Sequence, residues 1–506
     1  MPGIPAWLFL TALGALVAVT AAIPALLEAR ATVPRTPQYA TFDLLRLPGA
    51  KRLLAWRPFQ FVVRLPFVFL FIVVILAGFL GSQFGNNNVS TVLTWTIWWA
   101  ALVLFILLFG KIWCLVCPWN AIAEWVQRLT WWGKRDVTSS LNLRWPRKLR
   151  NIYLAIGLFV LLTWLELGFK VTISPWATAT LGLLMLAMTV IPAMYYDRKP
   201  FCRYGCLVGR VSGLYALFSP IELRARDKAV CLECETKDCV RGNERGYGCP
   251  TQEYLGTMDL NTYCILCTEC IKTCPRDNVA LNVRPPAMDL LKASRLRPDE
   301  AYLTVAILSL TTFHGVTMAP FWSDLVITVQ DWLGGGLAGG IVAFSLGMAT
   351  ILAAPGLVLL AMAWVSRRFS GTEDSLKTTA ISYAYALLPV ALLYHLAHNS
   401  QHLLREGQRI VSLISDPLGW GWNIFGTAAW NTGTILSMAK IHPLQVALLV
   451  LGHAFAVYVA YHVSRRLMRQ RSQRLRALAP ILAMVLGFSV VNLLLLAQPM
   501  SMRSLF

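Results

Sequence analysis

The sequence predicts an all-α polytopic membrane protein with about ten transmembrane helices and one small polar domain. Two observations predict this class. Apolar residues make up 57% of the 506 residues and gather in long runs, and about 20 apolar residues are enough to span a bilayer. The segment 200–300 is instead polar and rich in cysteine. A backbone in hydrocarbon must satisfy its own polar groups, so we expect the apolar runs to be helices.

The predicted spans follow one another along most of the chain. They are 6–27, 66–83, 91–110, 151–169, 177–196, 302–322, 341–365, 379–401, 443–464 and 477–497. The first span lacks a basic leading region and a clear cleavage site. We therefore interpret it as an uncleaved helix and not as a signal peptide.

The distribution of positive charge predicts that both termini lie outside (N-out and C-out). The formal net charge is +20, and Lys and Arg gather in alternate loops, at 30–57, 111–150 and 464–476, whereas 81–90 has none. Loops with such an excess stay in the cytoplasm. We expect a multi-pass protein of the cytoplasmic (inner) membrane of a prokaryote, with the polar domain in the cytoplasm. Because the positive charge follows the loops between spans, it argues against a nucleic-acid partner.

These patterns divide the chain into four predicted parts. Residues 1–60 hold the first helix and a basic cytoplasmic loop, and 61–222 form a four-helix membrane domain with two cysteine pairs at helix ends. Residues 223–298 form the small cytoplasmic domain, and 299–506 form a five-helix membrane domain that contains histidines.

The stretch "CILCTECIKTCP" at 264–275 carries the clearest chemical signal. Its C-x2-C-x2-C-x3-C-P spacing is typical of bacterial-type [4Fe–4S] ferredoxins. A second run, Cys231-x2-Cys234-x4-Cys239, is completed by Cys249 and Pro250 after an insertion at 240–248. Zinc is the alternative, since Cys-x2-Cys pairs also build zinc ribbons. The eight cysteines and two Cys-Pro endings favour iron–sulfur clusters, which a reducing cytoplasm also favours over disulfides.

The two runs predict two clusters with crossed ligands. In two-cluster ferredoxins the fourth cysteine of each run ligates the other cluster. The predicted ligands of cluster 1 are Cys231, Cys234, Cys239 and Cys274. The predicted ligands of cluster 2 are Cys249, Cys264, Cys267 and Cys270.

Two further cysteine pairs lie where helices meet the cytoplasm. They are Cys114 with Cys117 after the third span, and Cys202 with Cys206 after the fifth. Each pair precedes an amphipathic stretch, which indicates an internal duplication of span, cysteine pair and interfacial helix. The pairs could form a third metal site, a redox-active dithiol or a contact with a quinone. Alternatively they are small buried residues at tight turns, because free cysteine packs like a small hydrophobe.

With these motifs, residues from about 60 to 290 resemble the ferredoxin-type membrane proteins of periplasmic nitrate reductase systems, which are quinol dehydrogenase subunits. They also resemble the C-terminal half of the nitrous-oxide reductase maturation and electron-donor protein. The resemblance rests on "CLVCPWNAI", "FCRYGCLVGR" and the two ferredoxin-type runs. The first pair is Cys-x2-Cys-Pro where the family has Cys-x3-Cys-Pro, and Leu207 stands where the family has proline. The resemblance implies electron transfer from membrane quinol to a reductase or maturation system across the membrane.

All seven histidines lie within 314–462, beyond the region of resemblance. Ionisable residues inside spans are candidates for function, and facing histidines can hold a b-type haem. Imidazoles can also bind copper, zinc or iron directly, or simply bond neighbouring helices. We expect His395 and His453 to lie at a similar depth in the membrane, where they could approach each other. We expect His462 to lie at the membrane interface. The candidate haem or metal ligands are His314, His395, His398, His402, His442 and His453.

The sequence favours an electron relay between the quinone pool, or a cytoplasmic donor, and a membrane or periplasmic redox partner protein. Its cofactors would be two [4Fe–4S] clusters, with haem b and quinone as candidates. Glu166, near the outer end of the fourth span, is a candidate for release of a quinol proton. The alternative is a metal-handling or maturation factor that uses the clusters to reduce copper or iron at the outer histidines. The sequence shows no catalytic residue for a substrate.

Overall fold

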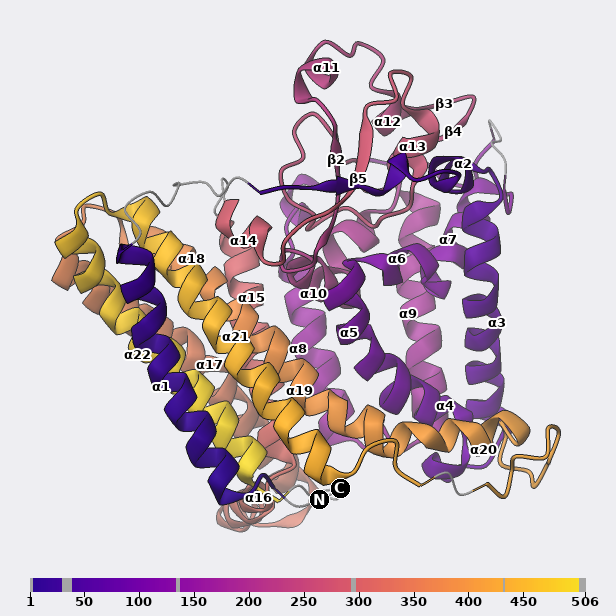
Figure 1. The fold of residues 1–506 in the computed structure, drawn as a ribbon. Coiled ribbons are helices and arrows are strands. Elements are labelled where there is room, and N and C mark those ends of the chain that lie inside the picture. Colours follow the sequence, from indigo (N-terminus) through magenta and orange to yellow (C-terminus); the bar gives the residue numbers. More distant parts are fainter. Residues whose placement is uncertain (1–2, 30–38, 133–136, 293–296, 431–432, 500–506) are drawn as a thin grey trace.

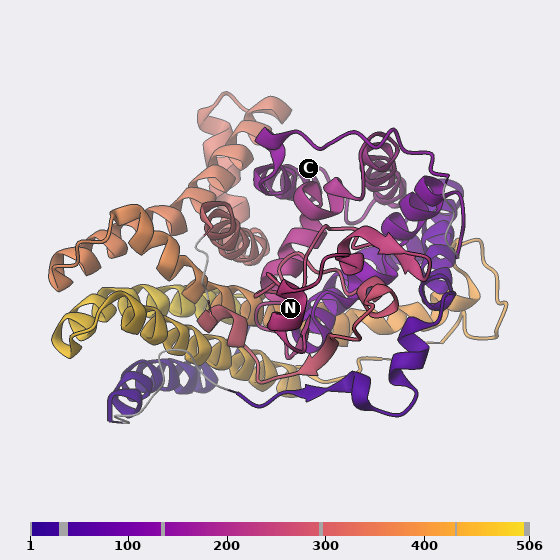
Figure 2. The same ribbon diagram turned by 90° about the horizontal axis from the view of Figure 1, so that it is seen from above.

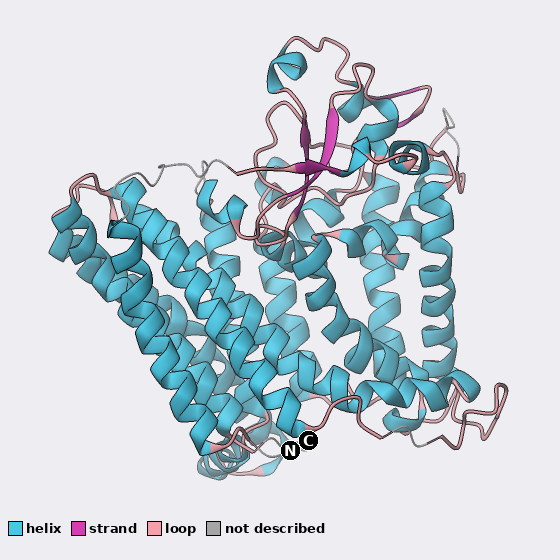
Figure 3. Cartoon of the chain, viewed as in Figure 1, coloured by secondary structure: helices cyan, strands magenta, loops and turns pink. Residues whose placement is uncertain are grey.

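Long helices form a bundle, and a small domain with strands covers one end of it (Figures 1 and 3). The computed structural model describes residues 3–29, 39–132, 137–292, 297–430 and 433–499. Two pieces of the predicted basic loops, 30–38 and 133–136, lie outside the described residues. The first long helix begins, and the last one ends, at the end of the bundle opposite the small domain (Figure 1).

Eight helical segments of the described chain are long and apolar enough to cross a membrane. They are Ala6–Ala29 (α1), Phe59–Leu80 (α3), Val89–Phe109, Pro175–Tyr195 (α9), Gly336–Ser370 (α17), Leu376–Ser415, Met438–Leu467 (α21) and Arg471–Ala497 (α22). Tyr153–Gly168 (α8) is apolar but shorter. All of the predicted spans overlap helices, and these eight segments indicate a membrane protein. N-out/C-out orientation stays a prediction.

Two of the crossing segments are interrupted. Val89–Phe109 consists of Val89–Thr91 (α4), a π-helix at Val92–Trp98 (η3) and Trp99–Phe109 (α5). Leu376–Ser415 consists of Leu376–Ala384 (α18), Tyr385–Leu387 (η6), Leu388–Glu406 (α19), Gly407–Arg409 (η7) and Ile410–Ser415 (α20). π-Helical turns are rare and often occur at functional sites.

The predicted span 302–322 ends in a sharp bend. Pro298–Thr317 (α15) meets Pro320–Trp332 (α16) at 89°. Pro320 lacks a backbone N–H and cannot continue the helix before it, so a new helix begins there. α16 therefore lies at the end of the bundle away from the small domain (Figure 1).

The first half of the chain contains two similar units of span, cysteine pair and short helix. In the first unit, α4 to α5 is followed by Ile112–Val116 (α6) and Pro118–Arg128 (α7). In the second unit, α9 is followed by a π-helical turn at Phe201–Gly205 (η5) and by Leu207–Tyr215 (α10). Both short helices lie at the bundle end under the small domain (Figure 1). The structure thus has the repeated order of elements that the sequence indicates.

The first helix packs with the last two helices. α1 contacts α21 and α22, and Figures 1 and 2 show it beside them. Glu28 accepts hydrogen bonds from Arg474 at 2.6 and 2.7 Å. The N-terminal helix is therefore part of the C-terminal bundle in space.

The small domain is built on a three-stranded antiparallel sheet. Ile221–Ala225 (β2) pairs with Val279–Val283 (β5), and Phe42–Asp43 (β1) pairs with the other edge of β5. The carboxylate of Asp43 accepts a hydrogen bond from the backbone N–H of Leu281 at 3.2 Å, which holds β1 in place. The domain therefore extends beyond the predicted 223–298, because it begins at Ile221 and takes one strand from the N-terminal loop.

Short elements complete the chain. Helices are Ala50–Ala55 (α2), Lys228–Leu232 (α11), Asp238–Arg241 (α12), Glu269–Thr273 (α13) and Met288–Lys292 (α14). The strands Gly242–Asn243 (β3) and Gly246–Tyr247 (β4) form a hairpin. Single 3-10 turns are Leu44–Arg46 (η1), Gly85–Asn87 (η2) and Arg147–Leu149 (η4).

Candidate functional site

The four cysteines predicted for cluster 1 lie together in the small domain. Burial raises the pKa of the Cys231 thiol, and the nearby Cys274 and Cys234 raise it further. Burial likewise raises the pKa of Cys239 to about 11, with Cys274 and Cys231 among its neighbours. Like charges close together disfavour ionisation, which explains this mutual effect.

The four cysteines predicted for cluster 2 form a second, adjoining group. Burial raises the pKa of Cys264 to about 11, and Cys249 contributes. Burial also raises the pKa of Cys270, and the contributing neighbours are Cys267, Cys264, Cys249 and then Cys239 of the first group. Cys270 thus has Cys249 of the first run among its neighbours, as the crossed assignment expects, and Cys239 is close enough to act on it as well.

Hydrogen bonds to sulfur repeat between the two groups. The backbone N–H of Glu253 donates to Cys249 Sγ at 3.3 Å, and that of Asn278 donates to Cys274 Sγ at 3.3 Å. Each acceptor is the cysteine that precedes a proline, and each donor lies four residues later. Such N–H donors tune the reduction potential of clusters, so this donor set fits iron–sulfur ligation.

The insertion that interrupts the first run forms the β3–β4 hairpin. Gly242 has a φ of +86°, a conformation that favours glycine and lets the chain turn. The backbone N–H of Cys249 then donates to the carbonyl oxygen of Cys239 at 3.0 Å. The hairpin thus returns the chain to the first run, and the departure from compact spacing leaves the cysteine grouping unchanged.

The four helix-end cysteines meet below the small domain. Burial raises the pKa of Cys117, and the neighbours that raise it further are Cys206, Cys114 and Cys202. The side-chain amide of Asn120 joins the two pairs, because its Nδ2 donates to the Cys114 carbonyl oxygen at 3.0 Å and its Oδ1 lies 3.8 Å from Cys202 Sγ. The internal duplication therefore brings four thiols to one place.

Two buried cations that sequence reasoning missed lie beside these thiols. Lys111 and Arg210 are each 1% exposed. Burial and then Arg210 lower the pKa of Lys111 to about 8, while Cys114, Cys264 and Cys206 act in the opposite direction. The available signal in the sequence was a lysine directly after a span and beside a cysteine pair.

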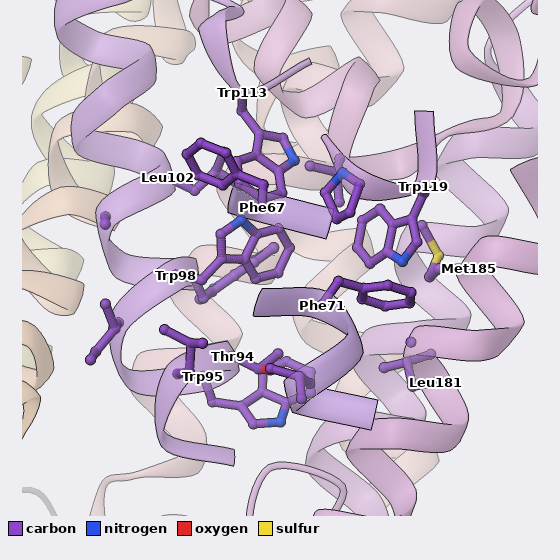
Figure 4. Close-up of a pocket in the computed structure, with 18 of the residues that line it drawn as sticks. Phe67, Phe71, Thr94, Trp95, Trp98, Leu102, Trp113, Trp119, Leu181 and Met185 are labelled. Atoms are coloured by element: carbon purple, nitrogen blue, oxygen red, sulfur yellow. The ribbon is translucent and has the colours of Figure 1, made fainter. Parts of the chain in front are cut away.

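An apolar cavity of about 450 Å³ opens among the helices beneath the helix-end cysteines. Its inner end is lined by Trp113, Val116 and Pro118 of the first unit and by Leu207 and Val208 of the second. Further lining residues include Phe67, Phe71, Thr94, Trp95, Trp98, Leu102, Trp119, Thr163, Glu166, Leu181 and Met185. Figure 4 shows these side chains around one space, drawn from several helices.

Tryptophan dominates the middle of the cavity. The ring centroid of Trp98 lies 5.1 Å from that of Trp113 and 5.9 Å from that of Trp119. Among the described residues, the indole N–H groups of all three have no hydrogen-bond partner. Buried indole N–H groups usually find a partner, so these three are unsatisfied donors in the walls of the cavity.

One carboxylate lines this apolar space. Glu166, near the C-terminal end of α8, has its Oε2 3.9 Å from His314 Nε2 on α15. The two residues come from different predicted domains. Glu166, the candidate for release of a quinol proton, therefore lies close to His314 from the C-terminal half of the chain.

The remaining histidines contact different neighbours. His395 Nδ1 lies 3.1 Å from the hydroxyl of Tyr215 on α10. Both ring nitrogens of His453 are within hydrogen-bond distance of hydroxyls, those of Thr20 at 2.8 Å and Ser489 at 2.9 Å. His453 thus contacts α1 through Thr20 and α22 through Ser489. These contacts favour the alternative in which the histidine hydrogen-bonds neighbouring helices and binds no cofactor.

The other histidines lie as follows. His398 and His402 are adjacent on α19, with ring centroids 5.4 Å apart, and His402 pairs with Glu406 at 3.4 Å. His442, at the start of α21, is buried. His462 lies between the rings of Tyr458 and Tyr461.

Within the described ranges, no group of three or more His, Cys, Asp or Glu side chains is arranged to hold a single metal ion. This holds for the histidines, for the two ferredoxin-type groups of cysteines and for the four helix-end cysteines.

Two stretches of the chain, residues 91–139 and 178–223, match a family model described as a 4Fe-4S binding domain. They correspond to the two units of span, cysteine pair and short helix, and end before Cys231. No curated protein and no solved structure matches the chain. The match supports a ferredoxin-type iron–sulfur protein. Together with the eight apolar helices, it indicates iron–sulfur electron transfer in a membrane protein.

Proposed function

We propose that this protein exchanges electrons between a quinone-class carrier in the membrane and two [4Fe–4S] clusters on its small domain, as a quinol dehydrogenase-type subunit. The position of the apolar cavity carries the proposal. Its lining residues Trp113, Pro118 and Leu207 are sequence neighbours of the helix-end cysteines. Its volume of about 450 Å³ falls in the range of small-molecule sites.

The lining chemistry supports a quinone-class ligand. A quinone has a flat apolar ring and two oxygens, which match aromatic walls and a few hydrogen-bond donors. The indole N–H groups of Trp98, Trp113 and Trp119 can donate to such oxygens, since they have no other partner in the described chain. A long isoprenoid tail would leave between helices into lipid.

Oxidation of a hydroquinone releases two electrons and two protons, so the site also needs a proton acceptor. Glu166 lines the cavity, and His314 lies 3.9 Å beyond it. We assign to Glu166 Oε the acceptance of a proton from a hydroquinone O–H, with His314 as the next acceptor toward the outer surface. Proton transfer to a positioned side chain typically accelerates such a step about 10²–10⁴-fold.

The eight ferredoxin-type cysteines would hold two clusters that each take one electron. Cys264, Cys267, Cys270 and Cys249 form the group nearer the membrane domain, since Cys264 lies in electrostatic contact with Lys111. Cys231, Cys234, Cys239 and Cys274 form the second group. A redox partner protein that reaches the small domain then takes the electrons from the clusters, so that the two electrons released by the hydroquinone are accounted for.

The orientation of the protein follows from its charges. The basic segments 39–57 and 111–132 lie at the same end as the small domain. The positive-inside rule then puts that end in the cytoplasm of a prokaryotic cell.

The test uses full-length protein purified without oxygen. Iron, sulfide and haem are measured, and EPR spectra are recorded after addition of a short-chain ubiquinol or menaquinol and, separately, of dithionite. We expect iron–sulfur signals that quinol produces at a rate set by quinol concentration. In Cys264→Ser, quinol-dependent electron throughput to an added acceptor should be lost, while a Glu373→Gln control on an exposed loop behaves as the native protein.

Clusters that dithionite reduces and that neither quinol reduces nor quinone oxidises would contradict the quinone assignment. Unchanged throughput in Cys264→Ser would contradict the role of the small domain. The haem measurement decides the haem b candidate independently of both. The metal-handling alternative predicts copper or iron bound at His395 and His398 without haem, and is tested by the same metal analysis.

A further inference from the structure

We infer that the junction between the small domain and the first membrane helices binds the headgroup of an anionic phospholipid, with Arg57, Arg245 and Lys272 around its phosphate. Two adjoining hollows form the site, and they share these three residues. The larger hollow has a volume of about 320 Å³. Its elements, α2, the start of α3 and the β3–β4 hairpin, lie at one edge of the molecule (Figure 1). A lipid can therefore reach the site from the surrounding bilayer.

The two hollows contain more positive charge than the neighbouring carboxylates offset. Their lining cations are Lys51, Arg57, Arg128, Arg245 and Lys272, and their lining acids are Glu124, Glu269 and Asp277. Asp277 pairs with Lys51 at 2.6 Å. Glu124 pairs with Arg128 at 2.6 Å and with the buried Arg64 at 2.8 Å. Two of the three acids are therefore already engaged.

The remaining three cations are available to an anion. Arg57 Nη2 donates to the Glu244 carbonyl oxygen at 3.3 Å, but neither Arg57 nor Arg245 forms an ion pair with another described residue. Lys272 is 8% exposed, and its Nζ lies 3.9 Å from Glu269 Oε1, beyond hydrogen-bond distance. A buried charge without a close partner is costly. Arginine binds phosphate oxygens well through its planar set of N–H donors, so a phosphate group fits this site.

Aromatic rings place the smaller hollow at the level of the lipid headgroups. Phe61 lies in the first turn of α3, which is long and apolar enough to cross a membrane. The ring centroids of Trp131 and Trp132 lie 5.8 and 5.0 Å from that of Phe61. Both tryptophans line the hollow, and they are 64% and 50% exposed. Exposed tryptophan is typical of the interface between membrane and water.

The exposed face of α3 provides a surface for acyl chains. Large apolar side chains are exposed along it at a spacing of three and four residues, which places them on one face of the helix. They are Val62, Leu65, Phe69, Ile72 and Leu76. A free phosphate ion cannot use this surface, whereas a phospholipid contacts both the cations and the apolar face. An anionic headgroup is favoured because the ammonium of a zwitterionic one would be repelled by the arginines without carboxylate partners.

The site connects two parts of the protein. Lys272 belongs to α13 of the small domain, between Cys270 and Cys274. Arg57 directly precedes α3 of the membrane bundle. The guanidinium of Arg128, on α7, lies 3.7 Å from the ring centroid of Tyr247 in the hairpin. A headgroup bound between these elements would therefore link the small domain to the edge of the bundle.

Native mass spectrometry of the full-length protein in detergent tests the inference. The protein is titrated with phosphatidylglycerol, with phosphatidylcholine that has the same acyl chains, and with inorganic phosphate. We expect one phosphatidylglycerol to bind at least about tenfold more tightly than the next and than phosphatidylcholine, since each basic residue near an anionic lipid contributes about fivefold. Inorganic phosphate at the same concentration should leave this lipid bound.

Two variants remove the cations that have no ion pair. Arg245→Gln should weaken the binding of phosphatidylglycerol about fivefold. Arg57→Gln combined with Arg245→Gln should remove the preference over phosphatidylcholine. Both arginines are exposed, and an unchanged iron content and gel-filtration profile verify that the variants fold. The control is Arg368→Gln, which removes an exposed arginine in the last turn of α17 that lines neither hollow.

Equal affinity of the native protein for the two lipids would overturn the inference. Displacement of the lipid by inorganic phosphate would overturn the assignment to a lipid and leave a site for free phosphate. An unchanged preference in Arg245→Gln, or an equal loss in Arg368→Gln, would show that these hollows are not the site. None of these results depends on quinol or on the clusters, so the proposed function stands or falls separately.

Discussion

Asn278 donates a hydrogen bond from its side-chain Nδ2 to the sulfur of Cys231 at 3.2 Å. Its backbone N–H donates to the sulfur of Cys274 at 3.3 Å. One residue thus bonds the first cysteine of the first run and the last cysteine of the second run. These two cysteines are 43 positions apart and are proposed to share cluster 1.

The first prediction concerns Asn278→Ala. Hydrogen bonds to sulfur stabilise the more negative, reduced cluster. Their loss should lower the midpoint potential of cluster 1 by on the order of 50 mV, close to the 59 mV that changes a one-electron equilibrium tenfold. An EPR-monitored redox titration measures the shift. Asn282→Ala on β5 is the matched control, because Asn282 bonds Glu222 at 3.2 Å; equal shifts in both variants would count against the sulfur bond as the cause.

The second prediction fills the cavity. Ala101→Trp on α5 places a large ring among the lining residues. Quinol-dependent reduction should fall by at least about tenfold while dithionite still reduces every cluster, since overpacking affects the cavity locally. Leu108→Trp on the same helix is the control, because Leu108 is 45% exposed and faces away from the protein interior. Stopped-flow absorbance measures the rates, and an unimpaired Ala101→Trp would place the quinone elsewhere.

The third prediction is a slower proton transfer in Glu166→Gln. The amide keeps the shape of the carboxylate but cannot accept the hydroquinone proton. Quinol oxidation should slow about 100-fold at neutral pH, with binding of a quinone analogue little changed. Single-turnover kinetics distinguish the two effects. A Glu166→Gln protein that turns over at the native rate would remove Glu166 from the reaction.

The fourth prediction concerns a buried network of charges within the small domain. Asp289 is 1% exposed, and it binds Arg224 at 2.9 Å and also pairs with Arg284. Although burial raises its pKa, Arg224 and Arg284 hold the pKa below its ordinary value. This stabilisation is therefore present above the unfolded pKa of about 3.9 and is lost as pH falls through the lower folded pKa.

Asp289→Asn should accordingly lower the free energy of unfolding by about 3 kcal/mol at neutral pH, because it leaves buried arginines without their partner. Its acid dependence below about pH 4 should be weaker than that of the native protein. Denaturant titration in detergent, followed by cluster absorbance, measures both. Asp259→Asn removes an exposed pair with Lys228 and should have little effect. Similar losses in the two variants would argue against a special role for the buried network.

The spacing of the cysteines along the sequence was sufficient to assign the eight ferredoxin-type cysteines to two groups. A C-x2-C-x2-C-x3-C-P run constrains a short segment, so the grouping of Cys264, Cys267 and Cys270 follows from local geometry. The crossed partners Cys249 and Cys274 were expected from ferredoxins, and in the structure Cys274 is a neighbour of Cys231 and Cys249 is a neighbour of Cys270. The insertion at 240–248 interrupts the compact spacing of the first run. It forms a hairpin, which brings Cys249 back beside Cys239.

Features made by distant segments could not be predicted in the same way. The cavity takes side chains from helices between Phe67 and Val208, and no local pattern indicates that their rings face one space. Helical periodicity indicates that His395, His398 and His402 share one face of a helix. It does not indicate which residues that face contacts. In the structure His395 contacts Tyr215, whereas His453 contacts Thr20 and Ser489.

The symmetry of the helix-end site has an evolutionary consequence. Each repeated unit supplies only two thiols, so a shorter ancestor with one unit could complete a four-thiol centre only by pairing with a second copy. In such a homodimer the centre would lie on the two-fold axis, with identical halves. Fusion of the two copies into one polypeptide freed each half to diverge. One unit now has Pro118 after its second cysteine and the other has Leu207. The present polypeptide would thus retain, within one chain, what was once a subunit interface.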